Sequence, residues 1–205
     1  MDYIKISMEE LMKWLKDHLS EKRYIHSIGT AECARDLAKK FGLNEEKAYM
    51  AGLLHDCAKC FPNEELIAII KEHLEVEDVE LMNYKTLHAP VSAYIAKKDF
   101  GVEDEEILSA IRWHTLGRIE MTDFEKIIFL ADKVEPKTRN KDYLEEVRDV
   151  LNSVDGLNKA MLDGLNKAML ICYKETIKSL VKRDLKICPV TIDIYNNLED
   201  IVNVN

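Results

Sequence analysis

The sequence predicts an all-α fold, organised as a helical bundle. Its 205 residues include only seven glycines and four prolines, so the turns that usually join β-strands are sparse. Apolar residues recur at helical spacing, and two capping boxes, Ser7–Glu10 and Thr122–Glu125, mark helix starts. Because 47% of the residues are hydrophobic, the chain can bury a core without crosslinks. We therefore expect one domain over residues 1–205, with its core at about 20–135 and C-terminal helices at about 140–205.

Composition and charge argue against several classes of protein. The net charge of −9 argues against a broad nucleic-acid-binding face. No apolar run reaches the ~18 residues of a membrane span, and the N-terminus lacks the pattern of a signal peptide. The five cysteines lie mostly in helical patterns, which indicates reduced thiols and a cytoplasmic protein. Cys57 and Cys60 form a CxxC pair, but the second pair of a zinc ribbon is missing, so a zinc or redox role is not favoured.

The first two predicted helices have clear ends. The first, at 7–20, is short, and the second runs from Arg23 to Phe41. Gly42 ends this second helix, because glycine accepts the left-handed conformation common after a helix. Its expected buried stripe consists of Ile25, Ile28, Ala31, Cys33, Ala34, Leu37, Ala38 and Phe41. His26 lies at the edge of this stripe.

The third predicted helix is the most apolar of the N-terminal half. Asn44 caps it, and residues 48–54 are apolar on nearly every side, so it should be the central buried helix. It ends in His55 and Asp56, where an imidazole and a carboxylate stand side by side. These two groups are potential metal ligands.

Three further helices are predicted in the middle of the chain. They span 62–74, 86–101 and 104–115. Pro90 fits the first turn of the second of these helices, where its missing N–H costs nothing. The acidic stretch 75–80 is interpreted as a solvated connection.

The C-terminal part begins with a strongly apolar helix behind the second capping box. This helix carries Asp132 near its end and breaks at Glu135–Pro136. A charged, loosely helical segment follows to about Ser153. A long helix then runs over about 155–182, and a short tail helix follows Pro189.

The long helix contains a tandem duplication. Residues 155–162 read DGLNKAML, and residues 163–170 repeat them without a change. At ~100° per residue, the added segment rotates the helix face by only ~80°. The duplication therefore lengthens the helix while roughly keeping its inner face, and we assign it no function.

Two histidines and two aspartates stand at breaks or ends of these apolar helices. They are His26, His55, Asp56 and Asp132. Such a mixed set of nitrogen and oxygen ligands suits Fe, Mn, Co or Zn better than Ca or Mg. Both aspartates follow apolar helical segments, where the negative end of the helix dipole disfavours a carboxylate and a bound cation would compensate it. Each residue alone also has an ordinary interpretation, as a helix-edge histidine or a surface carboxylate.

Ordered blocks of sequence surround these four residues. They are Arg23–Ser27, Ala51–Lys59, Leu87–Pro90, His114–Arg118 and Glu125–Asp132. Together they resemble the YqeK-type symmetrical bis(5′-nucleosyl)-tetraphosphatases, a branch of the HD superfamily of metal-dependent phosphohydrolases. Lys186–Thr191 resembles the C-terminal segment of that branch, so the resemblance covers nearly the whole chain. It implies an HD-domain helical bundle with a metal site in the core helices, and hydrolysis of diadenosine tetraphosphate to two ADP.

The resemblance also implies roles for single residues. His26, His55, Asp56 and Asp132 match metal ligands, with iron as the expected divalent metal and Mn, Co or Zn as alternatives. The positions that match nucleotide contacts are Arg23, Asp56, Cys57, Ala58, Lys59, His88, His114, Arg118, Asp132 and Arg139. Arg139 stands one residue late relative to the family's pattern, and Leu116 stands where the family usually has threonine. The expected partner is a nucleotide, without nucleic acid or membrane, and a homodimer is left open.

The expected reaction needs a base and an acid. Asp56 would hold or accept the proton of the attacking water, and His88 or His114 would donate a proton to the leaving ADP. The two histidines have alternative interpretations as helix-end residues or as ligands of a second metal. Two other functions stay open: an HD phosphohydrolase for a mono-, tri- or signalling nucleotide, and a nucleotide-binding regulator without activity.

Overall fold

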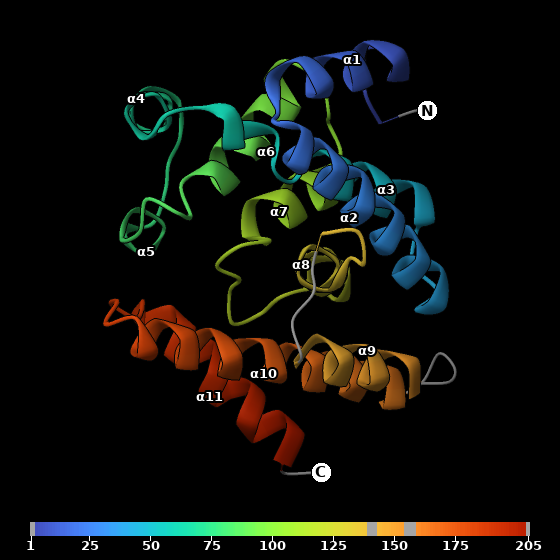
Figure 1. The fold of residues 1–205 in the computed structure, drawn as a ribbon, viewed down its shortest axis with the longest axis vertical. Coiled ribbons are helices and arrows are strands. Elements are labelled where there is room, and N and C mark those ends of the chain that lie inside the picture. The colour runs from blue at the N-terminus through green and yellow to red at the C-terminus, as the bar shows by residue number, and fades with distance from the viewer. Residues whose placement is uncertain (1–2, 139–142, 154–158, 204–205) are drawn as a thin grey trace.

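The computed structural model describes residues 3–138, 143–153 and 159–203. In these ranges the elements are α-helices and one 3-10 helix, without a strand, which confirms the predicted all-α fold. The helices are α1 (Met8–His18), α2 (Glu21–Lys40), α3 (Glu45–Leu54), η1 (Cys57–Cys60), α4 (Asn63–His73), α5 (Asp78–Leu81), α6 (His88–Lys98), α7 (Glu105–Trp113), α8 (Asp123–Val134), α9 (Tyr143–Ser153), α10 (Lys159–Lys182) and α11 (Pro189–Asn203). Figure 1 shows α9, α10 and α11 as a layer beneath α8, with the N-terminal helices above it.

Helices α2 and α3 pack closely at the centre. The inner residues of α3, from Ala48 to Leu54, are almost all buried, as the apolar pattern predicts. A Cβ atom at Gly52 would lie 2.8 Å from the Cα atom of Ala31 and 2.9 Å from the carbonyl oxygen of Thr30. Only glycine allows the two backbones to approach this closely, and the approach brings the ends of α2 and α3 together.

Helix α2 buries most of the predicted stripe, including Ala31 and Ala34, but not its first residue. Ile25 is 40% exposed, so its place in the predicted stripe is wrong. His26 and Thr30 are buried instead, because α2 packs against α8 as well as against α3. The periodicity of a single helix does not reveal this second neighbour, which turns His26 into the interior.

The chain turns sharply after α3 through the 3-10 helix η1. The backbone N–H of Ala58 donates to Ser92 Oγ at 3.0 Å, which ties the turn to α6. The side chain of Cys57 is fully buried against the same helix, and burial raises the pKa of its thiol above the ordinary range. This turn places His55 and Asp56 at the end of α3 and fixes Lys59 beside α6.

Residues 75–80 were predicted to form a solvated connection, and this prediction is wrong at Glu80. This residue lies at the end of a capping box with Glu77 and is only 3% exposed. The Arg112 side chain, from α7, donates to both of its carboxylate oxygens, through Nη2 at 2.6 Å and Nε at 3.0 Å. This long-range pair explains why an acidic stretch forms the short helix α5 instead of a solvated loop.

The C-terminal layer is attached to the core through α10. Tyr173 stacks on Phe129 of α8 with ring centroids 5.3 Å apart, and its hydroxyl donates to the carbonyl oxygen of Leu116 at 2.8 Å. Gly117 has φ 75°, and a Cβ there would lie 2.1 Å from that hydroxyl, so the loop after α7 needs glycine. The tail helix α11 covers 15 residues and is longer than predicted.

The second copy of the duplicated octapeptide lies in α10. Its Leu165, Ala168 and Met169 are buried, so this copy presents an apolar face to the core. The first copy lies outside the residues whose side chains the structure describes. Within the described ranges, no helix is long and apolar enough to cross a bilayer.

Candidate metal centre

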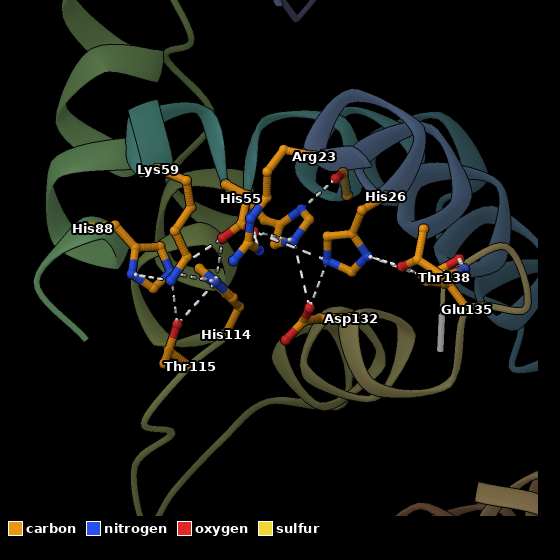
Figure 2. A network of polar contacts seen from close by, with 12 residues as sticks. Arg23, His26, His55, Lys59, His88, His114, Thr115, Asp132, Glu135 and Thr138 are labelled. Atoms are coloured by element: carbon orange, nitrogen blue, oxygen red, sulfur yellow. Dashed lines mark hydrogen bonds and ion pairs between the residues drawn. The ribbon is translucent and has the colours of Figure 1, made fainter. Parts of the chain in front are cut away.

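Side chains from five helices meet in one buried cluster. His26 comes from α2, and His55 with Asp56 follows α3. The cluster also contains His88 of α6, His114 at the end of α7 and Asp132 of α8. None of them is more than 7% exposed. Figure 2 shows the histidines in a row, with Lys59 and His88 at one side and Glu135 and Thr138 at the other.

The four residues predicted as metal ligands lie within reach of one another. His26 Nε2 is 2.9 Å from Asp132 Oδ1 and 3.9 Å from Asp56 Oδ2. His55 Nε2 is 3.6 Å from the same oxygen of Asp132 and 3.7 Å from Asp56 Oδ2. Residues more than 100 positions apart in the chain, such as His26 and Asp132, are therefore side by side.

The orientation of His55 fits a cation. Its Nδ1–H donates to the carbonyl oxygen of Gly52 at 2.6 Å, so Nε2 carries the lone pair. This Nε2 is buried without a hydrogen-bond partner among the described residues and faces two carboxylate oxygens. An electron pair aimed at two anions is unfavourable unless a positive ion lies between them. The donor set therefore suits a divalent metal held by nitrogen and oxygen.

Glu135 orients His26 in the same way, and sequence reasoning did not assign it to the site. Its carboxylate is fully buried and accepts from His26 Nδ1 at 3.0 Å. It also accepts from the backbone N–H groups of Lys137 and Thr138 at 2.7 and 3.0 Å. Burial alone would raise the pKa of Glu135, but the hydrogen bonds from His26 and Thr138 outweigh it and lower that pKa. The sequence does contain a signal for Glu135, because this acid directly follows an apolar helix, as Asp132 follows an apolar segment.

A second group of possible ligands shares Asp56. Its Oδ1 lies 3.1 Å from His88 Nε2 and 3.5 Å from His114 Nε2. The two Nε2 atoms are 3.2 Å apart, and the Thr115 hydroxyl lies within 3.2 Å of both. Asp56 therefore bridges the two halves of the cluster.

The two histidines of this second group differ in where they carry their proton. His114 Nδ1–H donates to the carbonyl oxygen of Ile111 at 2.7 Å, so its Nε2 carries the lone pair. Lys59 Nζ donates to His88 Nδ1 at 2.9 Å, which leaves the proton of His88 on Nε2, directed into the cluster. The sequence could not distinguish these two residues, because their roles depend on partners from other helices.

Burial and contacts shift the titration of the cluster. Burial would raise the pKa of Asp56, but His55, His114 and His88 outweigh it and hold that pKa well below its usual range. Burial lowers the pKa of His88 to about 4 and also lowers those of His114 and Lys59. Arg23 Nη1 donates to Asp56 Oδ2 at 2.8 Å. The cluster thus holds the ionised carboxylate of Asp56 beside the neutral imidazoles of His88 and His114, which is the protonation state that binds a metal.

The other predicted nucleotide contacts have different surroundings. The side chains of Cys57 and Ala58 are buried in the hydrophobic core. The guanidinium of Arg118 donates to Glu125 at 2.8 and 3.2 Å. Arg139 lies outside the described residues.

A cavity of about 500 Å³ lies beside the cluster, between α8 and the C-terminal helices. Thr115 and Lys133 line it, and both touch the cluster: Thr115 through the two histidines, Lys133 through Asp132 Oδ2 at 3.1 Å. Phe129 and Tyr173 supply aromatic surface, and Cys188 also lines the cavity. The cavity is therefore adjacent to the cluster and offers apolar and aromatic surface to a flat organic ring. Its wall also carries four cations, Lys85, Lys133, Arg183 and Lys186.

Comparisons with known proteins agree with this geometry. A family model described as the HD domain matches residues 23–137. A protein of Halalkalibacterium halodurans named symmetrical bis(5′-nucleosyl)-tetraphosphatase is 41% identical over 187 residues, covering 91% of this chain and 94% of that protein. A Bacillus subtilis protein with the same name is 37% identical over 191 residues, covering 93% of this chain and 97% of that protein.

A solved structure is similar over the whole fold. It is a crystal structure from Clostridium acetobutylicum, described as an HD superfamily hydrolase involved in NAD metabolism, with a TM-score of 0.85 and 36% identity. The match covers 96% of this chain and 98% of that one. The chain therefore belongs to the HD domain family and, within it, to the family of the symmetrical bis(5′-nucleosyl)-tetraphosphatases.

Proposed function

We propose that the protein is a metal-dependent hydrolase that cleaves diadenosine tetraphosphate symmetrically into two ADP. The observation that carries this proposal is the buried His/Asp cluster beside a cavity that has aromatic walls. Two near full-length relatives whose names give this activity support it. In the reaction, water adds to one central phosphorus and the central P–O–P bond breaks, so each half leaves as ADP.

His26, His55, Asp56 and Asp132 would hold the metal, for which iron is our first choice and Mn, Co or Zn are alternatives. Two imidazoles and two carboxylates suit these ions. When bound, such a metal polarises a phosphoryl oxygen and lowers the pKa of a water molecule. Glu135 keeps His26 in the tautomer that offers Nε2 to the metal.

Proton transfer would be shared by Asp56 and His88. Asp56 contacts both halves of the cluster and stays ionised, so it can hold or accept a proton of the attacking water. His88 directs its Nε2–H into the cluster, so it can pass this proton to the leaving ADP oxygen while Lys59, whose pKa burial lowers, gives one to His88 Nδ1. His114 offers a lone pair on Nε2 and would position that proton.

The substrate's phosphates would be held by nearby cations. Arg23 and Lys59 both contact cluster residues, Arg23 through Asp56 and Lys59 through His88. One nucleoside would enter the cavity beside Phe129 and Tyr173, near the segment that contains Cys188. Arg118 and Arg139 stay predictions as nucleotide contacts. We expect the enzyme to act in the cytoplasm, where its five cysteines remain reduced.

Product analysis tests this function. The purified protein is incubated with diadenosine tetraphosphate and Fe, Mn or Co, and the nucleotides are separated. ADP as the sole product supports the proposal, while AMP with ATP, or no cleavage, contradicts it. Asp132→Ala should lower both metal content and turnover, whereas His88→Ala should lower turnover far more than metal content.

The same assay separates the alternative functions. Cleavage of a mono-, tri- or signalling nucleotide in preference to diadenosine tetraphosphate would favour another HD phosphohydrolase. Binding of ADP without any product would favour a regulator.

A further inference from the structure

A second hollow, of about 770 Å³, adjoins the cavity beside the cluster. The two share Lys85, Lys133, Thr176, Leu180 and Arg183 along their common wall. The second hollow continues from this wall between α9 and α10, where Lys178 and Lys182 line it but not the first cavity. The two spaces are therefore neighbouring compartments with different walls.

The second hollow is cationic. Its lining includes Lys85, Lys133, Lys178, Lys182 and Arg183, against Glu175 as the one acid. Lys178 pairs with Glu175 at 2.5 Å, but no carboxylate among the described residues pairs with Lys182 or Arg183. This local positive charge contrasts with the net charge of −9 of the whole chain. Unpaired like charges around a concave surface repel one another, and an anionic ligand would relieve that repulsion.

Lys133 connects this hollow with the metal cluster. Its Nζ lies 3.1 Å from Asp132 Oδ2, and its side chain lines both hollows. A polyphosphate held at the cluster would therefore reach the wall that separates the two compartments. A ligand with one anionic centre and two ends could extend into both of them.

We propose that the cationic hollow binds the second nucleotide half of the substrate, the half whose nucleoside does not enter the aromatic cavity. This inference rests on the proposed function, because only a dinucleoside polyphosphate supplies two such halves. Both hollows carry cations, but the first adds the rings of Phe129 and Tyr173 for a base. The second adds Lys178 and Lys182 beside the single ring of Tyr143, so charge contributes more to its hold on the second half. Lys178 and Lys182 thereby act as specificity-determining residues for a substrate with a nucleoside at each end.

The charge-reversal variant Lys178→Glu/Lys182→Glu tests the proposal. Both side chains are exposed, and neither touches the cluster, so fold and metal content should stay unchanged. We expect KM for diadenosine tetraphosphate to rise by at least about tenfold with little change in kcat. In calorimetry with metal and ADP as the probe, the wild type should bind two ADP per chain and the variant one.

The matched control is Lys167→Glu/Lys174→Glu, which makes the same charge change on exposed positions of α10 outside both hollows. It should leave KM and the ADP stoichiometry within twofold of the wild type. An unchanged KM in Lys178→Glu/Lys182→Glu, or an equal change in the control, overturns the proposal while wild-type cleavage persists. If the wild type does not cleave diadenosine tetraphosphate at all, the proposed function itself fails.

Discussion

Each of three histidine rings in the cluster is held at Nδ1 and offers Nε2. The acceptors that fix Nδ1 are the carbonyl oxygens of Gly52 and Ile111 and the carboxylate of Glu135. Two of these acceptors are backbone atoms three residues before the histidine, so the helix end itself sets the tautomer. His88 differs because Lys59 occupies its Nδ1. The chemistry of each ring is thus decided by a partner that touches the opposite nitrogen.

Glu135→Gln tests this control of the ring at His26. The amide keeps one acceptor but loses the charge that strengthens Nε2 as a ligand, and its NH2 group faces backbone donors at Lys137 and Thr138. We expect metal affinity to fall about 10–100-fold and unfolding free energy to fall by about 1–3 kcal/mol. Metal titration and thermal denaturation measure the two effects.

Glu32→Gln is the matched control, because Glu32 pairs with Lys137 at 2.7 Å on the surface. Its effect on stability should stay within about 0.5 kcal/mol, and metal affinity should not change. Equal metal affinities in Glu135→Gln and the wild type would show that Glu135 does not tune His26.

At the scale of elements, the close contact of α2 with α3 determines the distance between the first two ligands. Gly52 permits this contact, and His26 and His55 lie near the ends that it brings together. Helix α8 then brings Asp132 against both histidines. The cluster therefore depends on how three helices are spaced, not on any one of them.

Gly52→Ala should separate α2 from α3. The added Cβ would meet backbone atoms of Ala31 and Thr30, at 2.8 and 2.9 Å, and backbone cannot move aside as a flexible side chain can. We expect a loss of about 1–3 kcal/mol in unfolding free energy, together with weaker metal binding. Chemical denaturation and metal analysis of the purified variant provide the measurements.

Glu46→Ala, on the exposed face of α3, serves as the comparison. It should keep both stability and metal content close to the wild type. A Gly52→Ala variant as stable as this control would contradict the spacing argument.

Helices could be predicted from the sequence far better than contacts between them. Caps at Ser7, Asn44 and Thr122 are local signals, and the structure has the corresponding helices. The burial of Glu80 could not be predicted, because it depends on Arg112 of another helix. The outward position of Ile25 likewise depends on the second neighbour of α2.

The candidate metal ligands of the site could be predicted because they also leave a local signal in the sequence. An acid after an apolar helix conflicts with the helix dipole, and this conflict is visible at Asp56 and Asp132. The structure gathers these residues with His26 and His55. The direction of each ring, and the cationic hollow lined by Lys178 and Lys182, arise from packing and have no local signature.

At the scale of the whole molecule, the metal would act as a crosslink among helices distant in sequence. Removing it leaves the carboxylates and lone pairs of the cluster facing one another. We expect a chelator to lower the Tm of the metal-loaded wild type. If free metal was present at a hundred times its Kd before chelation, the free energy of unfolding should fall by about 2.7 kcal/mol.

Asp132→Ala should remove this response. Its Tm should be the same with and without chelator, because one carboxylate of the cluster is missing. Differential scanning calorimetry of both proteins, before and after chelation, makes the comparison. A wild-type Tm that chelation leaves unchanged would exclude a structural contribution of the metal.

The contact between Arg23 and Asp56 has a consequence for how the enzyme matures in the cell. Arg23 is 42% exposed at its side chain, yet it already neutralises part of the Asp56 charge at 2.8 Å. A newly synthesised chain can therefore complete its tertiary structure with this guanidinium as a provisional counter-ion. Loading would then occur on a folded protein, so the rate at which the cell activates the enzyme should follow its supply of free metal ions.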